Sequence, residues 1–151
     1  MPFVIEKTVE IAAPADVVWE VITDLARYPE WNPFQVQMQT SFKPGDAIDM
    51  QVKLMAKPQA QREWVTEFIP GKRFAYQMKA VPLNTLSSQR SHDVEAIGPG
   101  RTRYRSYFHL KGWLHPVVVG LLGSKLQAGF AGMTAALQQR AEDLARQRKA
   151  A

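Results

Sequence analysis

The last quarter of the chain predicts one long amphipathic helix, over Pro116–Arg148. Apolar residues recur there in steps of three and four, which places them on one face of an α-helix. They are Val119, Leu122, Leu126, Phe130, Met133, Leu137, Ala141 and Leu144. A helix of about 30 residues spans about 45 Å, so it needs a large apolar surface on which to lie. This requirement limits the folds that the remaining residues can adopt.

The residues before this helix contain seven segments in which apolar and polar residues alternate, as in half-buried strands. Short turn signals such as Lys43-Pro44-Gly45-Asp46 and Gly98-Pro99-Gly100 separate several of them and favour antiparallel neighbours. The terminal helix is the only large element that can cover the apolar face of such a sheet. The sequence therefore predicts an α+β fold in a single domain, residues 1–151. The predicted strands are Phe3–Ile11, Phe34–Phe42, Ala47–Met55, Gln61–Ile69, Arg73–Val81, Ser87–Ile97 and Thr102–Leu110.

Two short helices are expected between the first and second strands. Pro14 fits the first turn of a helix, and Val18, Ile22 and Leu25 give that helix an apolar stripe. The segment Tyr28–Pro33 contains two prolines, and residues before proline avoid the helical region. A break followed by a second short helix or turn is therefore predicted.

Composition excludes several function classes. The chain has no cysteine, which rules out disulfides and thiolate catalysis and fits a cytoplasmic protein. The N-terminal residues do not have the pattern of a signal peptide. The apolar segment Trp113–Leu122 is too short for a membrane span. The three histidines lack the spacing of metal ligands, and no phosphate-binding glycine motif occurs, so we expect no metal and no cofactor.

The net charge of +5 is spread along the chain among acidic residues. The last strand carries Arg103 and Arg105 on its predicted outer face, and the preceding strand carries Asp93 and Glu95 there. Cross-strand ion pairs explain this arrangement without a nucleic-acid partner.

The segment Ile11–Trp19, followed by Asp24 and by Tyr28-Pro29-Glu30-Trp31-Asn32-Pro33, resembles the entry segment of the polyketide cyclase/dehydrase family. That family belongs to the START-like (SRPBCC), helix-grip superfamily. The Lys43-Pro44-Gly45 turn and the long final helix also match the order of elements in that family. The resemblance implies a curved sheet that grips the C-terminal helix around a hydrophobic cavity. It supplies no universal catalytic residue.

Alternation along the strands predicts which side chains line this cavity. Large apolar residues face inward in the central strands, and Trp31 and one face of the terminal helix complete the wall. The predicted wall residues are Trp31, Met50, Leu54, Trp64, Phe68, Tyr76, Met78, Tyr104, Phe108, Leu122, Leu126 and Phe130. Four glycines, Gly120, Gly123, Gly129 and Gly132, lie in the first half of that helix. They indicate either close packing on the sheet or part of the cavity wall.

The same alternation places two polar residues, Arg90 and His92, inside. A buried arginine requires a partner or a wet cavity, so these two, with Tyr76 and Tyr104, are the expected binding site for the polar end of an apolar ligand. The alternative is that this strand end lies at an exposed rim, or that a bulge shifts its faces. The run Ser91-His92-Asp93 is not a catalytic triad, because neighbouring side chains in a strand point to opposite faces.

Three functions remain open from the sequence. The first is binding of a small hydrophobic ligand that is lipid-like, polyketide-like or aromatic. The second is an enzyme of the cyclase or dehydratase kind, with His92 or a tyrosine as acid–base and Arg90 holding an enolate-like charge. The third is a protein-interaction module with a filled core and an exposed apolar patch. A homodimer is left open in each case.

Overall fold

The computed structural model describes all 151 residues as one seven-stranded antiparallel sheet and one long helix. The strands are β1 (Phe3–Ile11), β2 (Gln35–Thr40), β3 (Ala47–Val52), β4 (Gln59–Ile69), β5 (Arg73–Met78), β6 (Ser87–Gly98) and β7 (Arg101–Lys111). The helices are α1 (Ala15–Thr23), a 3-10 turn (Leu25–Arg27), α2 (Tyr28–Trp31) and α3 (His115–Ala150). The predicted elements and their order are confirmed. The predicted strands 34–42, 47–55 and 73–81 were too long at one or both ends.

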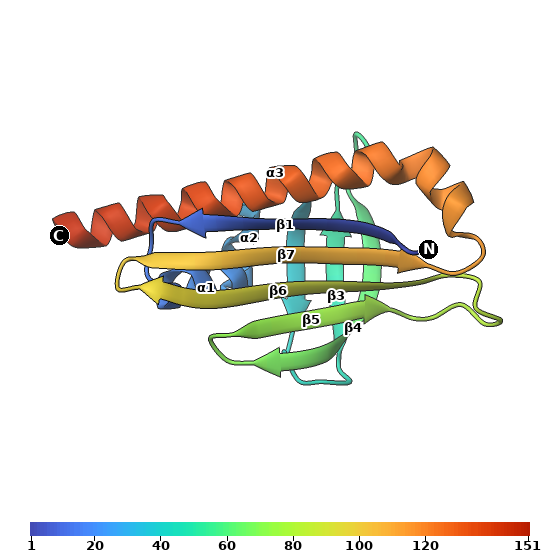
Figure 1. The fold of residues 1–151 in the computed structure, drawn as a ribbon, viewed down its shortest axis with the longest axis horizontal. Helices are drawn as coiled ribbons and strands as arrows, with labels where there is room; N and C mark the ends of the chain where they lie inside the picture. Colours follow the sequence, from blue (N-terminus) through green and yellow to red (C-terminus); the bar gives the residue numbers. More distant parts are fainter.

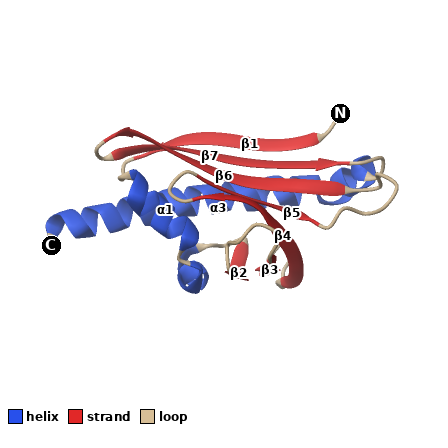
Figure 2. Ribbon diagram, turned by 90° about the horizontal axis from the view of Figure 1, so that it is seen from below, coloured by secondary structure: helices blue, strands red, loops and turns tan.

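The sheet has the strand order β1-β7-β6-β5-β4-β3-β2 and is strongly curved. Figure 1 shows β2, β3 and β4 crossing behind the nearly parallel axes of β1, β7 and β6. The register of β4 against β5 shifts between Val65 and Glu67, which is a β-bulge, and bulges bend a strand and increase its twist. Helix α3 runs along the concave side, and α1 and α2 close one end of the sheet (Figure 2).

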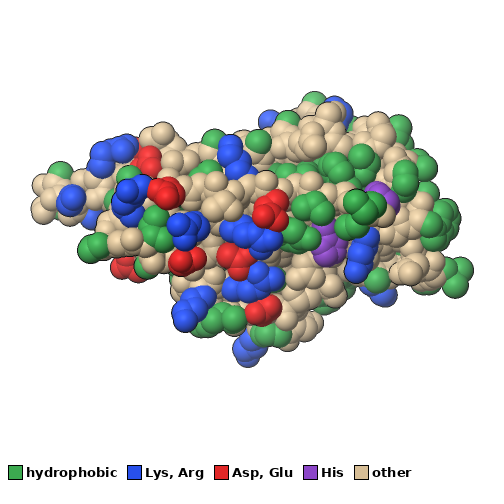
Figure 3. Space-filling view, viewed as in Figure 1, with side chains coloured by type: hydrophobic (Ala, Val, Ile, Leu, Met, Phe, Trp, Pro, Cys, Tyr) green, Lys and Arg blue, Asp and Glu red, His purple; other side chains and the backbone are tan.

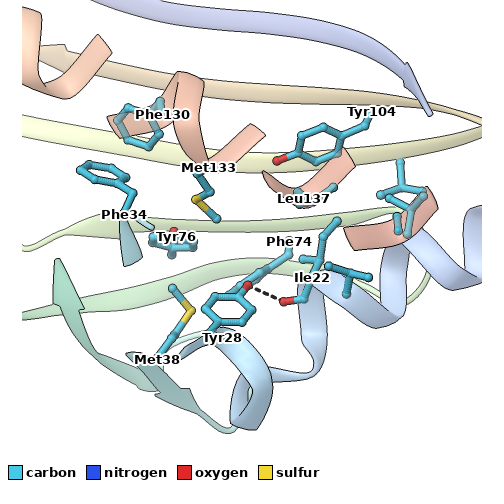
Figure 4. Packing of buried hydrophobic residues seen from close by; sticks show 14 of the residues in the cluster. Ile22, Tyr28, Phe34, Met38, Phe74, Tyr76, Tyr104, Phe130, Met133 and Leu137 are labelled. Atoms are coloured by element: carbon cyan, nitrogen blue, oxygen red, sulfur yellow. Dashed lines mark hydrogen bonds between the residues drawn. The ribbon is translucent and has the colours of Figure 1, made fainter. Parts of the chain in front are cut away.

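The core lies between the sheet and the second half of α3. Met133, Leu137 and Ala141 of α3 are fully buried, as the apolar face of the predicted helix requires. Figure 4 shows Met133 and Leu137 directed towards Tyr76 and Tyr104 of the sheet. The hydroxyl of Tyr28 donates a hydrogen bond to the carbonyl of Ile22 at 2.5 Å, which ties α2 to α1. By length and composition alone α3 is long and apolar enough to cross a membrane, and 22% of its most apolar 18-residue stretch is buried.

The glycines of α3 have different surroundings. A Cβ atom at Gly129 would lie 2.4 Å from the ring of Phe34, whereas a Cβ at Gly120 would meet nothing within 4 Å. Gly129 therefore permits close packing of α3 on Phe34, a residue that is 3% exposed. Gly120 has no such requirement.

These surroundings predict opposite effects for two identical substitutions. Gly120→Ala should raise the free energy of unfolding by about 1 kcal/mol, since alanine is the better helix former. Gly129→Ala should lower it, because the clash with the buried Phe34 ring costs about 1–3 kcal/mol and exceeds that gain. Urea unfolding of both variants measures the two signs. Equal stabilisation of both would show that Phe34 moves aside freely.

Candidate functional site

A cavity of about 360 Å³ lies between the first half of α3 and strands β2 to β7. Its wall is mostly apolar, and the polar residues that line it are Gln35, Gln61, Arg62, Glu63, Ser88 and Arg90. Eight of the residues expected to bind ligand line it: Leu54, Tyr76, Met78, Arg90, Phe108, Leu122, Leu126 and Phe130. Phe34 and Phe130, which line the cavity and belong to the core, pack edge to face with ring centroids 4.9 Å apart (Figure 4). The cavity is therefore a separate space adjoining a packed core.

The other six expected residues do not line this cavity. Met50 and Tyr104 are buried in the core, and Phe68 packs against Trp19, Phe42 and Phe74 there. Trp31 borders a polar surface cleft between α1 and the end of α3. The remaining two are Trp64 and His92.

The predicted inward position of Trp64 is wrong, and the bulge in β4 explains the error. Trp64 is paired with Gln77, which is exposed, whereas its neighbour Val65 is 2% exposed and is paired with the buried Tyr76. Alternation counted back from Phe68 places Trp64 inside only if the strand is regular. The bulge around Thr66 reverses the faces before it.

The reversed faces bring a carboxylate into the cavity that alternation had assigned to the outside. Glu63 lies in the wall, paired with Met78 across the strands. It is only partly accessible to solvent, and burial raises its pKa from the ordinary 4.5 to about 7, although the charge of Arg90 acts in the opposite direction. No sequence signal marked it, since a bulge cannot be read from apolar alternation alone.

Arg90 is the buried cation of this site. Its side chain enters from β6 and is 2% exposed, so the inward position of Arg90 is confirmed and the exposed-rim alternative is wrong. Nη1 lies 2.7 Å from the hydroxyl of Ser106 and 3.1 Å from the carbonyl of Ser91, and the guanidinium lies 4.8 Å from the ring centroid of Phe130. Arg90 forms no ion pair with a carboxylate, and its Nε has no hydrogen-bond partner.

A buried guanidinium without a carboxylate partner is costly in the empty protein. An anionic or carbonyl group that enters the cavity gains a charge-assisted hydrogen bond there. Tyr76 is paired with Arg90 across the strands, and its hydroxyl accepts a hydrogen bond from Nε2 of Gln35 at 2.8 Å. Burial raises the pKa of Tyr76 above 10.0. This tyrosine stays neutral and orients Gln35.

His92 lies behind the cavity wall, fully buried in the core. Its Nδ1 is 2.6 Å from the hydroxyl of Tyr104, and its ring stacks on Phe74. Burial, with a smaller contribution from the Arg90 charge, holds its pKa well below 6.5, so the imidazole is neutral. His92 therefore lies where it can support the core and Tyr104, out of reach of a molecule in the cavity.

The outer face of the sheet carries paired charges. Arg103 pairs with Glu95, and Arg105 pairs with both Asp93 and Glu6. Figure 3 shows acidic and basic side chains interleaved over these strands. The cross-strand ion pairs expected from the sequence are therefore present.

The family model described as "Polyketide cyclase / dehydrase and lipid transport" matches residues 2–142. The chain belongs to this family. No curated protein matches it in sequence. Membership in the family supports a ligand-binding or cyclase role.

Solved structures show the same START-like, helix-grip fold. The Zhui aromatase/cyclase from Streptomyces sp. R1128 superposes with a TM-score of 0.73 at 17% identity, covering 98% of this chain and 96% of that chain. A START superfamily protein from Mycobacterium smegmatis gives 0.70 at 19% identity, covering 93% and 98%. A norcoclaurine synthase from Thalictrum flavum, in complex with a transition-state analogue, gives 0.69 at 17%, covering 95% and 96%. At these identities the similarity shows the fold.

Proposed function

We propose that this protein binds a small hydrophobic molecule, lipid-like, polyketide-like or aromatic, in the cavity between α3 and the sheet. The carrying observation is the combination of an apolar wall with one unpaired, buried guanidinium, that of Arg90. Such cavities bury the apolar body of a ligand and use a few polar groups to orient it. The polar or anionic end of the molecule lies against Arg90, and the apolar body extends between Phe108, Leu122 and Leu126.

Two fluorescent probes of nearly the same shape test this proposal. 1-Anilinonaphthalene-8-sulfonate carries a sulfonate, and N-phenyl-1-naphthylamine carries the same rings without charge. Both should bind the protein at one site, become fluorescent and raise the melting temperature, because ligands that bind only the folded state stabilise it.

Adjacent residues of α3 provide the matched variants for this test. Leu122 lines the cavity, whereas Leu121 is 73% exposed. Leu122→Trp fills the cavity and should weaken both probes by roughly tenfold or more, and Leu121→Trp should leave that binding site intact. Equal binding to both variants would place the probes on the surface and remove the cavity from the proposal.

A second candidate function, an enzyme of the cyclase or dehydratase kind, is favoured by Glu63. A carboxyl group with a pKa of about 7 in the same cavity as a fixed cation fits acid–base work near neutral pH. Glu63 would take a proton from the carbon beside a carbonyl, while Arg90 stabilises the enolate oxygen. The protonated Glu63 would then return that proton to a β-hydroxyl, which leaves as water. Loss of turnover with retained binding in Glu63→Gln would distinguish this function from binding alone.

The third alternative, a protein-interaction module, predicts a filled core. The cavity of about 360 Å³ argues against a filled core.

A further inference from the structure

One end of the molecule exposes large apolar side chains next to the cavity. Leu83 is 90% exposed, Trp113 67%, Val117 56% and Leu121 73%, and we call these four residues the apolar tip. Val117 and Leu121 are four residues apart and lie on one side of the start of α3, and Trp113 lies in the turn just before it. In the most apolar 18-residue stretch of this helix, only 22% is buried. Exposed apolar groups of this kind mark interaction sites.

The apolar tip is a preformed structure. The indole Nε1 of Trp113 donates a hydrogen bond to the carbonyl of Leu83 at 3.2 Å. The backbone amides of Trp113 and Leu114 donate to the carbonyls of Asn84 and Thr85, which join the β5–β6 loop to the start of α3. Gly112 allows this contact, because a Cβ there would lie 2.4 Å from the Thr85 carbonyl oxygen. These hydrogen bonds hold the β5–β6 loop in place, with the Leu83 side chain exposed to solvent.

The backbone conformation at position 83 is one that leucine rarely adopts. Leu83 and Asn84 both have positive φ angles, +63° and +57°, in a turn between the bridged residues Val81 and Leu86. Asparagine and glycine adopt this conformation readily, whereas leucine is disfavoured. A leucine in this turn contributes no packing and adds strain, so it does not serve the stability of the isolated protein.

The charges around the apolar tip are of one sign. No aspartate or glutamate occurs between Glu67 and Asp93 or between Glu95 and Glu142, and these two segments include the β5–β6 loop and the start of α3. Lys79, Lys111 and Lys125 are exposed there. Figure 3 shows the same end, on the right, with apolar and basic side chains and no acidic ones, in contrast to the paired charges further left.

We propose that the apolar tip docks on an anionic lipid surface. Leucine and valine side chains at the tip would enter the headgroup–acyl boundary, where tryptophan is also favoured, and the lysines would face acidic headgroups. Val118 and Leu122, which line the cavity, adjoin Val117 and Leu121 of the tip, so docking brings the cavity close to the bilayer. The surface is independent of the ligand proposed above, and each can fail without the other.

Cosedimentation with vesicles tests the proposal. The protein should bind vesicles of phosphatidylglycerol and phosphatidylcholine at low salt. Its binding should be roughly tenfold weaker to vesicles of pure phosphatidylcholine, and roughly tenfold weaker to the anionic vesicles at high salt. The variant Leu83→Asn/Val117→Gln/Leu121→Gln should lose roughly tenfold or more of the anionic binding. The single variant Leu83→Asn should bind less and melt at a higher temperature, since asparagine suits the turn. Ile69→Thr, an exposed apolar residue outside the tip, is the matched control and should bind as the wild type does.

Trp113 supplies a direct signal of insertion. Brominated lipids should quench the wild-type fluorescence more than that of Trp113→Phe, which retains the other three tryptophans. Absence of binding to anionic vesicles at low salt, or equal binding by the triple variant, would overturn the proposal. Self-association in sedimentation velocity that the triple variant abolishes, without vesicle binding, would also overturn it and assign the tip to a second copy of the chain.

Discussion

Arg90→Met is expected to weaken binding of anilinonaphthalene sulfonate by roughly 30-fold or more, and of the uncharged naphthylamine by only a few fold. Methionine keeps an unbranched apolar stem and removes the guanidinium with its charge. The sulfonate then loses a charge-assisted hydrogen bond in a buried site, where such a loss costs about 2–5 kcal/mol. The uncharged probe loses only contacts with the wall. Fluorescence titration of both probes against wild type and variant gives the four dissociation constants.

The stability of the same variant is the control for its fold. Arg90 has no carboxylate partner, so its removal relieves a buried charge while Ser106 and two carbonyl groups lose a donor. These effects oppose one another. The melting temperature without ligand should therefore change by only a few degrees. An equal loss of both probes would mean that Arg90 shapes the wall without contacting the anionic group, and an unchanged sulfonate affinity would remove Arg90 from the site.

Much of this architecture could be predicted because apolar periodicity reports which side of an element is buried. The steps of three and four in α3 identified Phe130, Met133 and Leu137 as its core face, and all three are buried. Alternation in β6 placed Arg90 inside, and the structure confirms that position. These predictions depend only on regular backbone over a few residues.

What the sequence could not predict depends on irregular backbone and on three-dimensional closure. The bulge in β4 exchanges the faces of Glu63 and Trp64, and no residue in that strand predicts a bulge. His92 was correctly placed on the inner face, yet the sheet curvature puts it behind the wall and beside Tyr104. Alternation predicts which side of the sheet a residue faces. It does not predict which part of a curved sheet the helix contacts, so the limits of the cavity could not be deduced.

Glu63→Gln is expected to remove a pH-dependent loss of stability between about pH 4.5 and pH 7. The pKa of Glu63 rises from 4.5 in the unfolded chain to about 7 in the folded protein, mainly through burial. Below pH 4.5 both states hold the proton, and the carboxyl group costs nothing. Within the window the folded state binds more protons, so its stability falls as pH rises, and above about pH 7 the full penalty applies. A shift of this size corresponds to about 3 kcal/mol.

Urea unfolding of wild type and Glu63→Gln across pH 4 to 8.5 measures this effect as a difference between two curves. The variant should match the wild type near pH 4 and exceed it by about 3 kcal/mol at pH 8, because a neutral amide in the wall requires no ionisation. Taking the difference cancels other titrations, including the charging of buried His92 on acidification. Glu95→Gln, an exposed carboxylate paired with Arg103, is the control and should follow the wild-type pH dependence. A constant difference at every pH would show that Glu63 ionises normally, and it would then lose its proposed part as an acid–base group beside Arg90.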